Sequence, residues 1–290
     1  MATASEGQYY VPHTARWPIV GSIGLTSLVV GFSLRLNGNE STGDNMMLTG
    51  LAITVIMMLG WFGEVIKESE GRFYNAQVDI SFRQGMGWFI LSEVMFFAAF
   101  FGALYYARIY SVPWVGGEGA GAVTNAVLWA DYEAAWPTNG PEAIGGQFQA
   151  MGAWGLPAIN TLILLTSGIT CTWAHHGILK GNRGAFIFGL FLTVLLGFIF
   201  VGLQVVEYMH GYQDLNLTLG SGIYGSTFYM LTGFHGFHVT VGAIMLLVMM
   251  IRAMRGHFTS EHHFGFEGAA WYWHFVDVVW LGLFIFVYWL

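Results

Sequence analysis

Cysteine and charge are the two things that this sequence has least of. Cys171 is the only cysteine among 290 residues, which excludes an internal disulfide and any iron–sulfur or dinuclear copper centre built from the chain's own thiolates. Charged residues make up 9% of the chain, whereas soluble domains carry about a quarter. The net charge is −7, and the sequence has no basic stripe and no Gly-rich phosphate loop. These features exclude a soluble domain and argue against nucleic-acid binding.

Apolar and aromatic residues are abundant in the sequence. Hydrophobic residues reach 55% and aromatic residues 17%, and there are 40 glycines, a combination typical of closely packed membrane helices. Seven apolar stretches are long enough to cross about 30 Å of hydrocarbon. They lie near residues 17–36, 46–66, 85–110, 156–174, 185–206, 225–251 and 269–290. The pattern predicts an all-α integral membrane protein with seven transmembrane helices in one domain, residues 1–290.

Positive charges predict the orientation of these helices. If the N-terminus is inside, the inner segments hold eight basic residues and the outer ends only two, Arg35 and Arg108. The inner ones are Arg16, Lys67, Arg72, Arg83, Lys180, Arg183, Arg252 and Arg255. This positive-inside bias predicts an inner N-terminus and an outer C-terminus. Residues 111–155 then form a long outer loop, for which we expect a functional or partner-facing role.

Glu93 is the most conspicuous charge within a span. It lies in GWFILSEVMFFAAFF, residues 87–101, where burying a charge costs about 2.5 to 3.5 kcal/mol on insertion scales. Four phenylalanines lie on the same side of the helix, at positions 89, 96, 97 and 100. Poor solvation there favours a protonated carboxyl. From periodicity alone, a neutral structural group and a proton carrier are both open.

Histidines form the second intramembrane group. His235 and His238 are three residues apart on one stretch, and His274 and Asp277 are three apart on another. Such spacing suits a polar network between helices, and it also suits a self-contained bis-histidine haem or a copper site. Glu207 is a further carboxyl near an outer helix end. A proton relay through His274 and Asp277 is a third alternative.

Longer stretches resemble a known family. The segments are WFGEVIKES (61–69), RQGMGWFILSEVMFF (83–97), TWAHHGILKGNR (172–183), LQVVEY (203–208), GSGIYGSTFYMLTGFHGFHVTVGA (220–243) and HFTSEHHFGFEGAAWYWHFVDVVWLGLFIFVYWL (257–290). They are similar to subunit III of cytochrome c oxidase. The resemblance implies a non-redox core subunit of an aa3-type oxidase, which couples electron transfer from cytochrome c to O2 with proton pumping. It implies a two-helix arm (1–70) and a five-helix arm (71–290) that form a lipid-filled V.

The resemblance also implies roles for individual residues and partners. Glu93 matches the family's intramembrane carboxylate, with a role in structure or in tuning an oxygen route. Trp61, Phe62 and Glu68 match a phospholipid-contact stretch, and Arg252 matches an arginine that meets a lipid phosphate. No residue of this chain is implied to be catalytic or to bind metal. Haem and copper are expected in partner subunits I and II, and phospholipid is expected to bind this chain.

Two departures limit the match. The family often has a histidine pair after the lipid-contact stretch, where this chain reads EGRFYNAQVD, and the 111–155 loop is longer than in short members. Subunit III of a quinol oxidase is the alternative within the family. The expected location is the bacterial inner membrane, with the mitochondrial inner membrane second.

Overall fold

The computed structural model describes residue 10 and residues 15–290. Across these residues the regular structure is helical and no strand occurs. Seven helices in this described part are long and apolar enough to cross a membrane, and the fold prediction is confirmed to that extent. The described chain divides into two compact units, residues 1–84 and 85–290, and the division falls inside α3.

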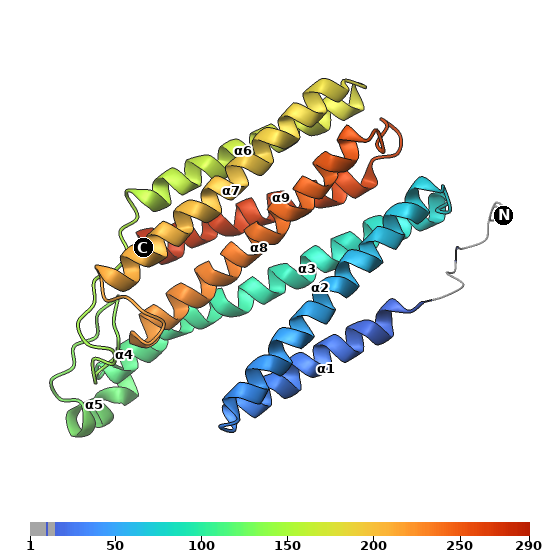
Figure 1. Ribbon diagram of the computed structural model, residues 1–290. Coiled ribbons are helices and arrows are strands. Elements are labelled where there is room, and N and C mark those ends of the chain that lie inside the picture. The colour runs from blue at the N-terminus through green and yellow to red at the C-terminus, as the bar shows by residue number, and fades with distance from the viewer. Residues whose placement is uncertain (1–9, 11–14) are drawn as a thin grey trace. The chain divides into compact units, whose positions relative to one another are not determined.

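The first unit is built on a hairpin of two helices, α1 (Trp17–Leu36) and α2 (Glu40–Glu70), which lie side by side (Figure 1). Small residues allow this close approach. A Cβ atom on Gly31 would lie 2.7 Å from the Met47 backbone nitrogen, and one on Gly50 would lie 2.7 Å from the Gly24 carbonyl oxygen. Both distances are shorter than real Cβ contacts allow, so these positions require glycine. Gly24 and Gly31 thus serve close packing of α1 on α2.

The first unit extends to residue 84, beyond residue 70, where the resemblance implies that the two-helix arm ends. α3 (Ala76–Tyr106) begins within it. The Tyr74 hydroxyl donates a 2.6 Å hydrogen bond to Glu68 Oε2, and the Tyr74 ring lies edge-on to Phe82 at 5.1 Å. These contacts fasten the turn after α2 and the first turns of α3 to the same unit.

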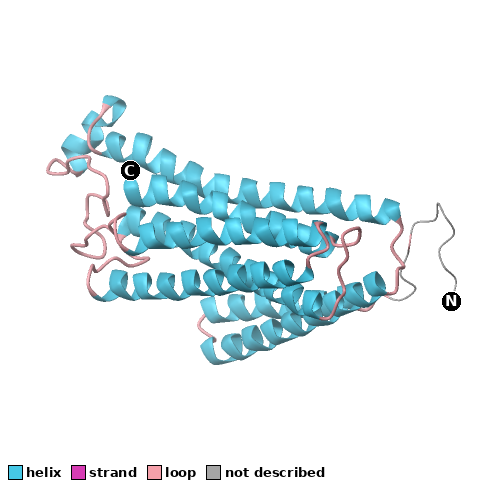
Figure 2. Ribbon diagram, turned by 90° about the horizontal axis from the view of Figure 1, so that it is seen from above, coloured by secondary structure: helices cyan, strands magenta, loops and turns pink. Residues whose placement is uncertain are grey.

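The second unit is a helical bundle. It contains the remainder of α3, together with α6 (Leu156–Leu179), α7 (Arg183–Gln213), α8 (Gly222–Met254) and α9 (Phe264–Leu283). The axes of these helices are roughly aligned, and the connecting loops lie at both ends of the bundle (Figures 1 and 2). α9 continues into a π-helical segment, Phe284–Trp289.

The core of this unit lies around α9. Trp273 and Trp280 are almost completely buried, and each indole satisfies its N–H on α6: Trp273 Nε1 donates to Ser167 Oγ at 3.0 Å and Trp280 Nε1 donates to Thr161 Oγ1 at 2.9 Å. Burial of large aromatic rings with a satisfied N–H is the usual arrangement in protein cores. Two tryptophans therefore fix the position of α9 against α6.

α6 and α7 form a second small-residue seam. A Cβ on Gly189 would lie 2.9 Å from the Ala174 side chain, and the Thr170 and Thr193 hydroxyls are 2.8 Å apart. Gly197 faces Trp273, whose ring atom would be 2.6 Å from a Cβ there. Gly189, Thr193 and Gly197 therefore form a row of small residues that packs within the bundle.

The loop at residues 111–155 has more structure than the sequence indicates. α3 continues through a π-helical turn (Ala107–Ser111) into α4 (Val112–Val115), and α5 (Ala122–Leu128) follows. The later part of the loop packs on the α7–α8 connection: Gln149 N donates to Leu215 O at 2.9 Å, and Asn216 Nδ2 donates to Gln147 O at 2.8 Å. Part of the 111–155 loop thus packs against the α7–α8 connection of the same chain.

Candidate functional site

In the first unit, a pocket of about 400 Å³ lies beside the α1–α2 hairpin. Its lining residues are Ala15, Trp17, Pro18, Gly21, Ser22, Leu25, Met57, Trp61, Glu64, Val65 and Glu68. Polar groups gather at one end of the pocket: Arg16 Nη2 lies 3.1 Å from Glu64 Oε1, and Trp17 Nε1 donates to Glu64 Oε2 at 2.5 Å. The pocket therefore combines an apolar wall with a charged end, which suits an amphipathic ligand.

The predicted lipid-contact residues of α2 lie at and beside this pocket. Trp61 lines it, is 51% exposed, and stacks on the 55% exposed Phe62 at a centroid distance of 6.2 Å. Glu68 accepts hydrogen bonds from the hydroxyls of Tyr10 at 3.0 Å and Tyr74 at 2.6 Å. Burial, and then the hydrogen bond to Glu68, raise the pKa of both tyrosines above the usual value. Glu68 is thus held by tyrosine hydroxyls rather than pointing freely outward.

Arg252 belongs to the second unit, whereas Trp61, Phe62 and Glu68 belong to the first. It lies near the end of α8, and its guanidinium carbon is 4.6 Å from the centre of the Phe258 ring. Its Nη1 is 3.9 Å from Met249 Sδ, and the residue is 8% exposed. Arg252 therefore offers less open surface for a ligand than Trp61 or Phe62.

Glu93 pairs with a histidine 145 residues away. Its Oε2 lies 2.9 Å from His238 Nε2, and His238 Nδ1 lies 2.6 Å from the Phe234 carbonyl oxygen. Because a carbonyl oxygen can only accept, Nδ1 must carry a proton. His238 Nε2 then either accepts a proton from a neutral Glu93 or carries one itself opposite a carboxylate. The hydrogen bond therefore links α3 to α8, and the His238 ring also contacts the rings of Phe96 and Phe97 at 5.9 and 5.1 Å.

His235 has different surroundings. It is fully buried, its Nε2 lies 3.2 Å from the Val276 carbonyl oxygen, and its ring packs on Phe200 and Trp280 at 5.7 and 5.1 Å. A histidine in this setting connects α8 to α9. His235 bonds to α9, whereas His238 bonds to Glu93 on α3. The two histidines, although three residues apart on α8, therefore serve separate helix contacts.

Glu207 is the most buried carboxyl of the bundle. It has no exposed surface, and its Oε1 accepts a 2.6 Å hydrogen bond from the Tyr288 hydroxyl. Its Oε2 meets no hydrogen-bond partner among the described residues. The pair joins the C-terminal half of α7 to the π-helical segment Phe284–Trp289.

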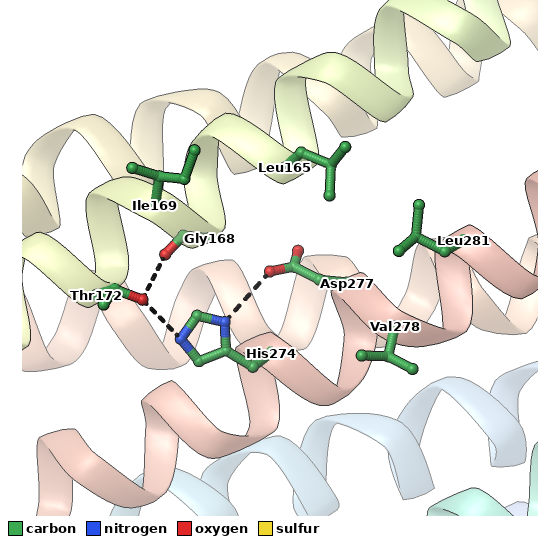
Figure 3. Close-up of a pocket in the computed structure, with 8 residues that line it drawn as sticks. All are labelled: Leu165, Gly168, Ile169, Thr172, His274, Asp277, Val278 and Leu281. Carbon is green, nitrogen blue, oxygen red and sulfur yellow. Dashed lines mark hydrogen bonds and ion pairs between the residues drawn. The ribbon is translucent and has the colours of Figure 1, made fainter.

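His274 and Asp277 lie in a groove of about 380 Å³ between α6 and α9 (Figure 3). His274 Nδ1 is 3.5 Å from Asp277 Oδ2, and His274 Nε2 is 3.4 Å from Thr172 Oγ1. His274 therefore faces α6, and the four predicted network residues His235, His238, His274 and Asp277 do not converge on one point. Within the described ranges there is also no cluster of three or more His, Cys, Asp or Glu side chains that could hold a metal ion.

Comparison with known proteins connects these features to a family. The family described as cytochrome c oxidase subunit III matches residues 7–290. The chain is similar to cytochrome c oxidase subunit 3 of Marchantia polymorpha (39% identical, covering 100% of this chain and 98% of that one) and of Gadus morhua (39%, 97% and 96%). The corresponding protein of Arabidopsis thaliana is 40% identical, with 100% and 98% covered.

The chain belongs to the cytochrome c oxidase subunit III family. It is thus a membrane protein and a subunit of a haem–copper oxidase. The family match runs through both units, so neither the α1–α2 hairpin nor the bundle is an addition to the family's architecture.

Within this subunit III chain, some partners of the site residues escaped sequence reasoning. The Glu93–His238 and Glu207–Tyr288 pairs join residues 145 and 81 positions apart, and Thr172 is an ordinary threonine in an apolar run. Only the contact of His274 with Asp277 is local and could be anticipated from the spacing of three residues.

Proposed function

We propose that this chain is the non-redox subunit III of an aa3-type cytochrome c oxidase, a complex that couples electron transfer from cytochrome c to O2 with proton pumping. The observation that carries the proposal is a family match over nearly the full length, residues 7–290. Haem and copper are assigned to partner subunits I and II, and this chain stabilises the catalytic subunit and sustains its proton uptake. The dispersed contacts of His235, His238 and His274 support this role over a self-contained haem protein.

The same proposal includes phospholipid binding by the two units. The exposed Trp61 and Phe62 rings provide an apolar surface for acyl chains, and the polar end of the neighbouring pocket suits a head group. Arg252 is assigned to a phosphate contact because a guanidinium can donate two parallel hydrogen bonds to it. We propose that the chain crosses the membrane with an inner N-terminus and an outer C-terminus.

The proposed membrane is the bacterial inner membrane. Plant relatives are 39–40% identical and animal relatives 37–39%, so the chain is about equally distant from both. Such equal distance supports an origin outside plants and animals.

The test is purification of a tagged chain from its native membrane in a mild detergent, followed by mass spectrometry and a visible spectrum. Subunits I and II should co-purify with a haem spectrum, and the spectrum should stay with them when this chain is removed. Activity with reduced cytochrome c but not with quinol assigns the electron donor. A chain that purifies alone with its own chromophore contradicts the proposal.

Glu93 is assigned to structure or to tuning of an oxygen route, and its substitution tests that assignment. Glu93→Gln keeps a hydrogen-bonding group beside His238 Nε2. We expect oxidase turnover within about threefold of wild type, the factor that corresponds to one intramembrane hydrogen bond of about 0.6 kcal/mol. Steady-state oxygen consumption measures it, and complete loss of activity in a fully assembled complex would refute the assignment. Glu93→Leu removes the polar group, and its lower thermal stability would isolate the structural part.

A further inference from the structure

Five buried polar atoms in the interior of the bundle have no hydrogen-bond partner among the described residues. They are Asn160 Nδ2, Asn160 Oδ1, Gln204 Oε1, Glu207 Oε2 and His235 Nδ1. Asn160, Glu207 and His235 have no exposed surface, and Gln204 is 5% exposed. The large majority of buried side-chain polar atoms in proteins are hydrogen-bonded, so these five atoms require a partner that can reach the interior.

The register of α6 and α7 brings Asn160 beside Gln204. The two helices form an antiparallel hairpin, in which the Thr170 and Thr193 hydroxyls are 2.8 Å apart. Asn160 lies ten residues before Thr170 on α6, so it lies opposite the position ten residues after Thr193 on α7. That position is residue 203, the immediate neighbour of Gln204.

α8 contacts the same turn of α7. Gln204 Nε2 donates to the Thr232 carbonyl oxygen at 3.2 Å, and a Cβ on Gly236 would lie 3.1 Å from Gln204 Oε1. His235 lies between Thr232 and Gly236 in the same turn of α8. Glu207 is three residues from Gln204, on the same face of α7. The unpaired atoms of α7 and α8 therefore lie at one level.

The Trp280 ring links this level to α6 and to the end of α9. Its Nε1 donates to the hydroxyl of Thr161, the neighbour of Asn160, and its ring lies 5.8 Å from the ring of Tyr288, the partner of Glu207. The residues with unpaired atoms thus form one layer across the bundle, which we call the polar layer: Asn160, Gln204, Glu207 and His235.

The atoms of the polar layer need both a donor and an acceptor. Asn160 contributes an N–H donor and an oxygen acceptor, and exchanging its amide atoms would leave both unpaired. Gln204 Oε1 is an acceptor, because Nε2 already donates to a carbonyl oxygen. A metal cation binds oxygen atoms but cannot accept a hydrogen bond from the Asn160 amide, and an acyl chain offers neither partner. Water offers both.

We propose that the polar layer binds internal water molecules that bridge Asn160 to Gln204, Glu207 and His235. A buried water makes about three hydrogen bonds, so about two molecules pair the five atoms. They link α6, α7 and α8 inside the bundle. The inference concerns the interior of this chain alone and does not depend on the oxidase assignment.

A density map of the wild-type protein, purified from its native membrane, tests the site directly. At a resolution that shows ordered solvent, we expect a peak about 2.7–3.2 Å from Asn160 Nδ2 and from at least one other atom of the polar layer. A layer without solvent density would overturn the proposal, and so would a direct hydrogen bond between Asn160 and Gln204. A peak that contacts only oxygen atoms, at about 2.3–2.6 Å, would indicate a cation such as calcium instead.

Asn160→Leu separates a hydrated layer from a dry one by the sign of its effect. In a dry layer the substitution removes two unpaired polar atoms and should raise the melting temperature of the full chain in detergent. In a hydrated layer it removes hydrogen bonds from the water. We expect the melting temperature to fall, by about 2–4 °C for each hydrogen bond lost. A higher melting temperature would overturn the proposal.

A double-mutant cycle tests whether water bridges Asn160 to Glu207. Asn160 has no direct partner among the described residues, so coupling to Glu207 requires a mediator. The effects of Asn160→Leu and Glu207→Met on the unfolding equilibrium constant should depart from a simple product by at least about twofold. Thr193→Val is the control partner for Asn160→Leu, because Thr193 lies about 15 Å further along α7. Its effect should multiply independently, and the same independence for Glu207 would contradict the bridge.

Discussion

The intramembrane carboxyls differ in how completely their oxygen atoms are paired. Glu93 is hydrogen-bonded to His238 and remains 21% exposed at its side chain. Glu207 has no exposed surface and depends on a single bond from Tyr288. A buried polar group that loses its partner costs about 1–3 kcal/mol. Glu207 is therefore the more sensitive of the two to the loss of its neighbour.

Tyr288→Phe tests this dependence on one hydroxyl. The substitution leaves Glu207 without its 2.6 Å donor, and we expect the unfolding free energy to fall by about 1–3 kcal/mol. Tyr212→Phe is the control, because Tyr212 lies on α7, the helix of Glu207, and is 51% exposed. Thermal unfolding in detergent measures both variants.

A double-mutant cycle then separates the pair from its surroundings. If Glu207 is first replaced by Met, Tyr288→Phe should cost clearly less than it does in the wild-type background, because no carboxyl remains to be stranded. Strictly additive costs would show that Tyr288 stabilises the bundle by ring packing alone.

At the scale of the helices, glycines determine which elements can approach closely. A Cβ on Gly31 would meet the backbone of α2, whereas a Cβ on Gly63 would meet no atom of the described structure within 4 Å. Backbone atoms cannot give way as a flexible side chain can. The packing of α1 on α2 therefore tolerates a side chain at Gly63 but not at Gly31.

Gly31→Ala should loosen the α1–α2 hairpin, with an overpacking cost of about 1–3 kcal/mol. Gly63→Ala is the matched control, since it adds the same methyl group in open space and improves helix propensity by up to about 1 kcal/mol. Protease susceptibility of the connection around Gly38 and thermal stability report the difference. Equal behaviour of the two variants would contradict the close approach seen here.

The helices themselves were predictable because long apolar runs determine them with little help from tertiary contacts. The predicted first span, 17–36, coincides with α1. The ends of the other predicted spans lie at most about nine residues from the observed helix ends. The pairing of polar side chains was not predictable, because it depends on how each helix is rotated about its axis. His274 illustrates this: its spacing from Asp277 was visible in the sequence, but the choice of Thr172 on α6 over His235 on α8 was not.

At the scale of the whole molecule, charge should determine the direction of insertion. Eight of the ten basic residues lie in segments on one side of the seven predicted spans, and such a bias places those segments in the cytoplasm. With an odd number of spans, the two ends of the chain must then lie on opposite sides. The prediction concerns insertion alone and is independent of the oxidase assignment.

Cysteine labelling with a membrane-impermeant maleimide tests this topology. Glu118→Cys should react in intact cells or right-side-out vesicles, because the loop after α4 is predicted to be outside. Lys180→Cys, in the turn between α6 and α7, should react only after permeabilisation or in inside-out vesicles. The native Cys171 is fully buried, so the background should be low in both preparations. The reverse pattern would place the N-terminus outside and would contradict the orientation that the basic residues predict.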